Sequence, residues 1–339
     1  MRRSLRRYAW LLKLLLTLLV IVGVAWRLRG DFRDFSAADI RVSFWRLAAS
    51  TGIFSVYLIA SALIWHLLTR LNGVSIGAAQ AVAVHLTSVL GKYVPGKVLL
   101  WGIRIFLYRR YRPDASVPAL FRCCFIEYVG GLATAFALVA ATLLVVDLSF
   151  ITTPMRIGVL IALALSLGAL HPIFLNGLAG RLARRIGLQE SLVTIRERHV
   201  LAACLMQLAN WFVLGLAVFV LAQGVCALGW NHFFLVTAGY TFAGVVGFLA
   251  FFAPSGIGVR EAVLIGVLGQ VMPVSDAAIT ALAARLASTL GEFVLAGGAW
   301  VSSETIRRTG VLRPRRGGLE TGAEPAAEGT SPSSWRARI

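Results

Sequence analysis

Long apolar runs recur along the chain, and they limit its fold more than any other feature. A helix of about 20 apolar residues crosses a bilayer, and backbone inside hydrocarbon has to satisfy its own hydrogen bonds. Six runs approach or exceed that length, and they cover residues 10–26, 47–68, 121–146, 157–175, 200–222 and 277–301. With 58% hydrophobic and only 14% charged residues, the composition excludes a soluble domain built around one core. We therefore expect an all-α, polytopic membrane helix bundle with about six full spans.

The basic residues lie mainly between the apolar runs and give the chain a net charge of +18. All but three of the 33 basic residues are arginines, and they gather in segments such as 104–122 and 181–198 and in the C-terminal tail. This placement argues against a nucleic-acid surface and favours contact with anionic lipid. The positive-inside rule puts both termini in the cytoplasm, with the first run retained as a span. The loop at residues 27–46, with five arginines on the predicted outer side, does not fit this pattern.

Two further apolar stretches, about residues 76–101 and 233–272, are each interrupted by a Pro/Gly break. The breaks read GKYVPGK at 91–97 and PSGIGVRE at 254–261. Each stretch is predicted to form a re-entrant helical hairpin, and the charges of the flanking loops indicate that the two hairpins enter the membrane from opposite faces. The result is an inverted repeat, as in many transporters. We expect one transmembrane domain over residues 1–305 and a disordered, basic cytoplasmic tail over 306–339.

The first break carries two of the three lysines of the chain, Lys92 and Lys97. Pro95 and Gly96 expose backbone groups between them, and a half-helix that begins near Lys97 would add positive potential. A lysine offers a compact, rotatable charge that suits a phosphate or carboxylate approached end-on. Anion binding is therefore one interpretation of this break. The other is that both lysines reach the cytoplasmic interface as ordinary anchors.

The second break combines Pro254, Gly256 and Gly258 with the charged pair Arg260 and Glu261. Broken helix inside hydrocarbon is tolerated only where protein or a water-filled cavity surrounds it, and intramembrane charge indicates function by default. Arg260 could hold a lipid phosphate through two hydrogen bonds. Alternatively, it forms a buried ion pair with a nearby acid.

The span after each hairpin carries an arginine followed by a glutamate. These residues are Arg122 and Glu127 in the first half, and Arg285 and Glu292 in the second. We expect them to form ion pairs or to bind a coupling ion. His85 on the first hairpin is isolated from any partner at metal-ligand spacing, and no nucleotide or hydrolase motif is present. No metal, cofactor or catalytic residue is expected.

The two breaks, read together as GKYVPGKV at 91–98 and PSGIGVREAVL at 254–264, resemble the flippase-like transmembrane family named after lysylphosphatidylglycerol synthase. The resemblance covers roughly residues 8–305. It implies the lipid-moving region without the cytosolic aminoacyltransferase domain of the best-known relatives. Two departures concern the substrate: Leu99 and Leu100 precede Trp101 where the family commonly has tryptophan at once, and Tyr128 follows Glu127 where members often carry arginine.

These observations favour a flippase or transporter that moves an anionic lipid, a phospholipid or a polyprenyl-phosphate carrier, between leaflets of the cell (plasma or inner) membrane. Envelope glycosyltransferases or lipid synthases are expected partners, alongside the lipid and the bilayer. One alternative is an integral-membrane glycosyl or aminoacyl transferase with a lipid-linked donor. A further alternative is a scaffold for envelope synthesis that transports nothing. Because no catalytic motif is present, we do not expect an enzyme.

Overall fold

The computed structural model of the chain describes residues 43–93, 98–145, 152–185, 193–250 and 256–308. Within these ranges the chain forms α-helices and two short 3-10 helices, and no strand. The elements are α2 (Phe44–Leu71), α3 (Ala78–Val89), η2 (Leu90–Tyr93), α4 (Val98–Tyr111), α5 (Val117–Val145), α6 (Thr153–Leu170), α7 (Pro172–Arg185), α8 (Glu197–Val225), η3 (Trp230–His232), α9 (Phe233–Leu249), α10 (Val259–Leu268) and α11 (Val274–Arg308). The predicted all-α fold is confirmed.

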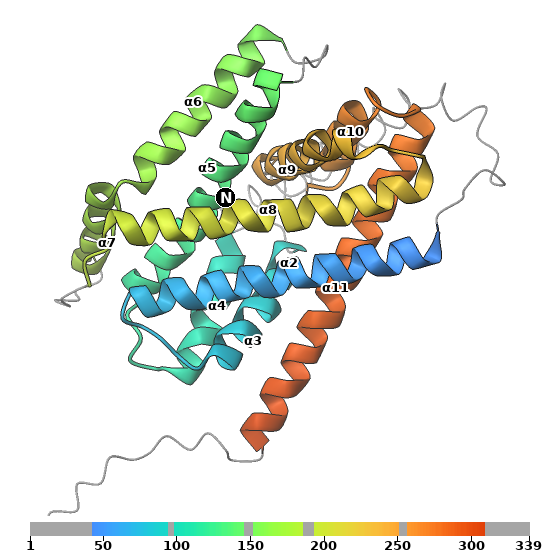
Figure 1. Cartoon of the computed structure of the whole chain (residues 1–339). Coiled ribbons are helices and arrows are strands. Elements are labelled where there is room, and N and C mark those ends of the chain that lie inside the picture. The colour runs from blue at the N-terminus through green and yellow to red at the C-terminus, as the bar shows by residue number, and fades with distance from the viewer. Residues whose placement is uncertain (1–42, 94–97, 146–151, 186–192, 251–255, 309–339) are drawn as a thin grey trace, which may run out of the picture.

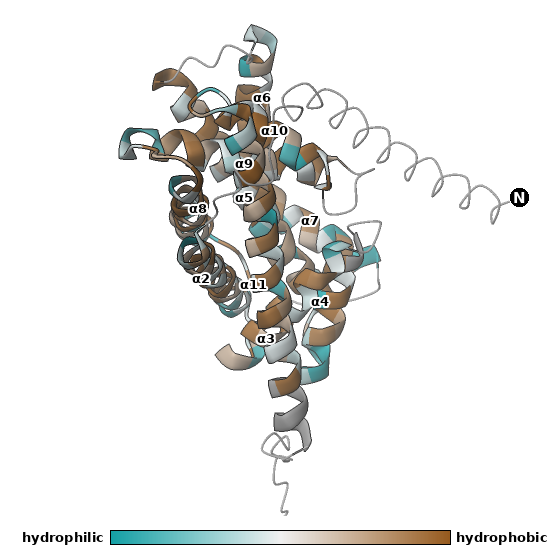
Figure 2. Ribbon diagram, turned by 90° about the vertical axis from the view of Figure 1, so that its right-hand side faces the viewer, coloured by the Kyte–Doolittle hydropathy of each residue, from teal (hydrophilic) through white to brown (hydrophobic). Residues whose placement is uncertain are grey.

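Within the described residues, six helical segments are long and apolar enough to cross a membrane. Five of them, in α2, α5, α6, α8 and α11, match predicted spans, and the sixth, Trp230–Leu249, contains α9. The predicted first span at residues 10–26 lies outside the described residues, as does the tail beyond Arg308. Figure 2 shows apolar residues along most of the length of the helices. The chain is a multi-span membrane protein.

The fourth predicted span, 157–175, extends too far toward the C-terminus. The helix α6 ends at Leu170, and α7 begins at Pro172 in a different direction (Figure 1). Proline disfavours helical backbone in the residue before it, and His171 is accordingly extended, with φ −61° and ψ 133°. The basic residues Arg184 and Arg185 lie exposed in the last turn of α7.

The helices α2 and α8 lie side by side across the molecule and belong to two separate apolar cores (Figure 1). One core contains Phe54 of α2 and Leu214 of α8, and it surrounds α9, α10 and part of α11. The other contains Trp65 of α2 and Val200 of α8, and it surrounds α4 and α5. Each core therefore lies around one of the two predicted hairpins, and the inverted repeat itself stays a prediction.

The predicted hairpins correspond to the adjacent pairs α3 with α4 and α9 with α10. The helices α3, α4 and α10 have 12, 14 and 10 residues, fewer than the about 20 that cross a bilayer. The segment containing α9 is long enough to cross. How deeply either hairpin enters the membrane stays a prediction. An aromatic contact joins the two pairs, because Tyr128 of α5 packs against Trp101 of α4 and stacks on Phe248 of α9.

Candidate functional site

The second break turns tightly because three glycines allow it. Gly256 and Gly258 have φ values of 69° and 82°, a left-handed conformation that other residues rarely adopt. A Cβ on Gly256 would lie 2.8 Å from the Cα and the carbonyl oxygen of Gly247. Gly247 is in turn packed against Arg260, whose Cβ lies 3.0 Å from where a Gly247 Cβ would be. The close approach of α9 to this turn therefore fixes the position of the Arg260 backbone and Cβ.

Six side chains from both halves make up a cluster that we name the central cluster: Lys92, Tyr93, Arg260, Glu261, Arg285 and Glu292. The carboxylate of Glu292 on α11 accepts hydrogen bonds from Lys92 and from the hydroxyl of Tyr93, the latter at 2.8 Å. Tyr93 also stacks on Phe293, with 5.6 Å between ring centroids. Glu292 is 8% exposed. The end of the first hairpin is therefore tied to the last span through a partly buried ion pair.

Arg260 is the cation of the central cluster that lacks a carboxylate partner among the described residues. Its guanidinium carbon lies 4.3 Å from the ring centroid of Tyr240, a cation–π contact. The structure places no described acid within 4.0 Å of its nitrogens. Its hydrogen-bond donors are thus directed toward no carboxylate in the described part of the chain.

Glu261 has two roles at the start of α10. Its Oε2 accepts the backbone N–H of Gly258 at 2.7 Å, which caps the helix. Its Oε1 lies 3.8 Å from a guanidinium nitrogen of Arg285 on α11. An acid at a helix N-terminus is also favoured by the helix dipole. Glu261 therefore shapes the turn and balances Arg285.

Lys92 lies within electrostatic reach of both Arg260 and Arg285. Three cations thus share the described part of this region with two carboxylates, Glu261 and Glu292. Buried charge in low dielectric is costly unless it is compensated. The arrangement favours binding of an anion beside Arg260.

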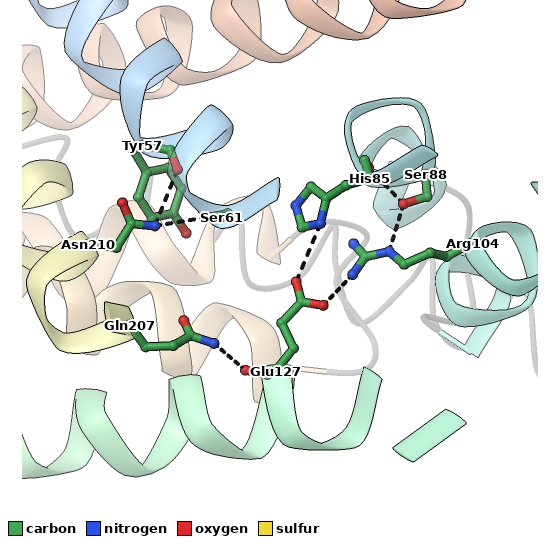
Figure 3. Close-up of polar contacts among 8 residues, drawn as sticks. All are labelled: Tyr57, Ser61, His85, Ser88, Arg104, Glu127, Gln207 and Asn210. Carbon is green, nitrogen blue, oxygen red and sulfur yellow. Dashed lines mark hydrogen bonds and ion pairs between the residues drawn. The ribbon is translucent and has the colours of Figure 1, made fainter. Parts of the chain in front are cut away.

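A second buried cluster lies in the first half, and we name it the Arg104 cluster: His85, Ser88, Arg104 and Glu127 (Figure 3). Arg104 donates to Ser88 Oγ at 2.9 Å and to Glu127 Oε2, and its guanidinium lies 4.9 Å from the Trp65 ring centroid. His85 Nδ1 lies 3.7 Å from Glu127 Oε1. Arg104 is 1% exposed. Its charge is therefore held in the protein interior by one carboxylate.

Arg104 is absent from the predicted site residues because the arginine-rich segment 104–122 is assigned as a whole to the cytoplasmic side. The side of the membrane stays a prediction, but Arg104 does not lie in a loop, since α4 continues past the predicted hairpin end at 101 to Tyr111. Arg104 and Tyr108 lie one helical turn apart on the buried face, whereas Arg109 and Arg110 are exposed. The apolar residues on either side of Arg104 are the signal that could have revealed it.

Arg122 lies in a different environment from Glu127, its predicted companion. Its guanidinium donates to Asn72 at 2.7 Å, to Asn176 at 2.9 Å and to the carbonyl of Val193 at 2.6 Å. These groups belong to the end of α2, to α7 and to the segment before α8. Arg122 thus fastens three parts of the chain together through neutral acceptors. Of the remaining predicted site residues, Pro95, Gly96, Lys97 and Pro254 lie outside the described residues.

Comparison with known families gives one match, to the family described as lysylphosphatidylglycerol synthase TM region, over residues 10–296. The chain belongs to this family. The match spans both hairpins and every described residue of the two clusters. A comparison with curated proteins finds no match. Membership of this family, in a multi-span membrane protein, indicates a role connected with membrane lipids.

Proposed function

We propose that this protein is a flippase that moves an anionic lipid between the leaflets of the cell membrane. The observation that carries the proposal is the excess of positive charge in the central cluster, where Arg260 faces no described carboxylate. A phosphate supplies the missing negative charge. Arginine binds phosphate through two parallel N–H···O bonds, which gives the contact both energy and direction.

Lipid is the source of phosphate that fits this position. The cluster is built from the ends of two broken helices and from α11, one of the helices long enough to cross a membrane. Transporters with inverted repeats bind their substrates at such broken helices between the repeats. A head group bound beside Arg260 leaves its apolar chains among apolar helices. A soluble anion has no apolar chains and would gain no binding free energy from the surrounding apolar helices.

Glu292 gives the site two states. In the empty protein Glu292 holds Lys92 and Tyr93. A phosphate that approaches Arg260 competes with Glu292 for Lys92, so that the bound lipid weakens the tie between the first hairpin and α11. Lipid binding would then shift the balance between two arrangements of the hairpins, as alternating access requires.

We also propose an orientation of the chain in the membrane and a class of protein partners. The arginine-rich connections place both termini in the cytoplasm, and the enzymes that make or consume the lipid act as partners at the same membrane. The chain itself is proposed to have no enzymatic activity.

Transport in proteoliposomes tests the proposal. Purified protein is reconstituted with fluorescent phosphatidylglycerol, and the fraction of label accessible to an external quencher is followed over time. Arg260→Met should slow transport by about 10- to 100-fold, because a hydrogen bond to a charged group contributes about 1.5–3 kcal/mol. Arg260→Lys should keep part of the rate.

Arg110→Met is the matched control. Arg110 is an exposed arginine whose guanidinium lies 5.0 Å from the ring of Phe106, a contact similar to that of Arg260 with Tyr240. The control should transport at the wild-type rate, and labelled phosphatidylcholine should move more slowly than phosphatidylglycerol. Transport by Arg260→Met at the wild-type rate would refute the proposed role of the site.

A further inference from the structure

His85 is a buried histidine whose Nδ1 has no hydrogen-bond partner among the described residues. It lies on α3 and is 2% exposed. The nearest charged group is Glu127 Oε1, at 3.7 Å, which is too long for a hydrogen bond (Figure 3). A polar atom buried without a partner is costly and calls for an explanation.

The other side of Glu127 is already occupied. Its Oε2 accepts from Arg104, which Ser88 and the Trp65 ring hold in place. The backbone carbonyl of Glu127 accepts from Gln207 at 2.7 Å. Arg104 and Glu127 together are neutral, and Oε1 remains the open acceptor on the side of His85. A shift of about 1 Å would bring the imidazole and Oε1 to the separation of a charge-assisted hydrogen bond.

The charges next to His85 come from α4 and α5, and the other elements packed on α3 carry ionisable side chains as well. The helix α4 contributes Arg104, and α5, which carries Arg104's partner, contributes Glu127. The helix α2 carries His66 and Arg70 close together near its end, and α11 carries Arg285 and Glu292. The last of these is held by Lys92, on the short helix η2 that follows α3.

We propose that His85 and Glu127 form a proton-binding site that is linked to lipid binding in the central cluster, so that lipid movement is coupled to protons. The inference rests on the proposed function and adds the coupling ion to it. A proton on His85 forms the missing hydrogen bond to Glu127 Oε1 and makes the Arg104 cluster positive by one charge. The site thus has two charge states, with His85 neutral or protonated, while Arg104, Ser88 and Trp65 keep their positions.

The link to the lipid is electrostatic. Seven positions along the first hairpin separate His85 from Lys92, which corresponds to about 10 Å along a helix. The empty central cluster repels a proton on His85, and a bound phosphate removes that repulsion. Two unit charges at this distance affect each other by on the order of tenfold in affinity at the effective dielectric of proteins. By linkage, the proton increases lipid affinity by the same factor.

Proton uptake by the purified protein measures this link directly. Dihexanoyl phosphatidylglycerol is added to weakly buffered protein in detergent with a pH indicator. Its phosphodiester stays ionised between pH 5.5 and 8, because this range lies about four units above a phosphodiester pKa. Titration of the lipid therefore does not contribute to the measured proton uptake. We expect the wild type to take up a fraction of a proton on binding, and to bind about tenfold more tightly at the lower pH.

His85→Gln should bind lipid with no proton uptake and with an affinity that does not depend on pH. His171→Gln, which changes an exposed histidine at the corner between α6 and α7, should behave as the wild type. Because the pH dependence of the wild type is itself decisive, the test does not depend on folding of the variant. The inference fails if wild-type protein binds the lipid without proton uptake, and the proposed function would then still stand. Absence of any lipid binding would overturn both.

Discussion

Replacement of Glu127 by glutamine tests how the protein holds a charge in its interior. The change leaves the shape of the side chain nearly intact and removes the negative charge opposite Arg104. Because Arg104 is 1% exposed and the Glu127 side chain 12% exposed, solvent cannot take over the compensation. We therefore expect a loss of stability and no large change of packing.

The size of the loss follows from the contacts that remain. Breaking a buried ion pair by removing one partner costs about 3–5 kcal/mol. The glutamine oxygen can still accept from Arg104, and Ser88 and the Trp65 ring stay in contact with it. These contacts place the expected loss near about 3 kcal/mol, the lower end of that range. For a chain of 339 residues this corresponds to a fall in Tm of about 4 °C in thermal unfolding.

Thermal unfolding of the purified protein in detergent, followed by intrinsic fluorescence, is the assay. Asp114→Asn is the matched control, because Asp114 forms an ion pair with Arg112 at 3.4 Å and its side chain is 75% exposed. An exposed pair contributes less than about 1 kcal/mol, so the control should unfold close to the wild type. Replacing both partners, with Arg104→Met and Glu127→Leu, should recover most of the loss. If Glu127→Gln unfolds at the temperature of the control, the buried charge is compensated in another way and the reasoning is wrong.

Two further substitutions address the framework of the sites. Gly256→Ala should lower the Tm by several degrees, because φ is 69° and the new Cβ would lie 2.8 Å from the backbone of Gly247. The control Gly266→Ala, at a helical position with open space around it, should leave the Tm unchanged or raise it slightly. Arg122→Met should cost about 2–4 kcal/mol, since it leaves the buried oxygen of Asn72 and the carbonyl of Val193 without their donor, whereas Asn176 keeps the N–H of Ile195. A Tm equal to that of the wild type would contradict this role.

The sequence was sufficient for the long apolar helices α2, α5, α8 and α11, because hydrophobic length acts locally. It misjudged residues 157–175, where Pro172 starts a new helix. It also treated every arginine near a helix end as a topological signal. Arg104 shows the limit of that rule, since a helix that continues past a predicted boundary carries its next arginine into the interior.

The partners of the buried acids could not be read from the sequence. The sequence predicted ion pairs for these acids but left their cations open, and in the structure Glu127 pairs with Arg104 and Glu292 with Lys92. Lys92 and Glu292 are 200 positions apart, and only the packing of α3 and η2 against α11 brings them together. A local spacing rule contains no information about such a contact. The residues themselves, Lys92, Glu127 and Glu292, are among the predicted site residues, and the structure shows each of them in an ion pair.

Both acids draw their cations from the first hairpin, and this has a consequence for the proposed transport. Arg104 ties that hairpin to α5 within the same half, and Lys92 ties it to α11 of the other half. Moving the hairpin in the empty protein separates at least one of these buried pairs, at a cost of about 3–5 kcal/mol. A bound phosphate replaces Glu292 as the partner of Lys92 and removes that cost. Without lipid, the hairpin should therefore move about 150- to 4,000-fold less often than with lipid bound. The charge pairs that stabilise the fold thus also make movement depend on the lipid.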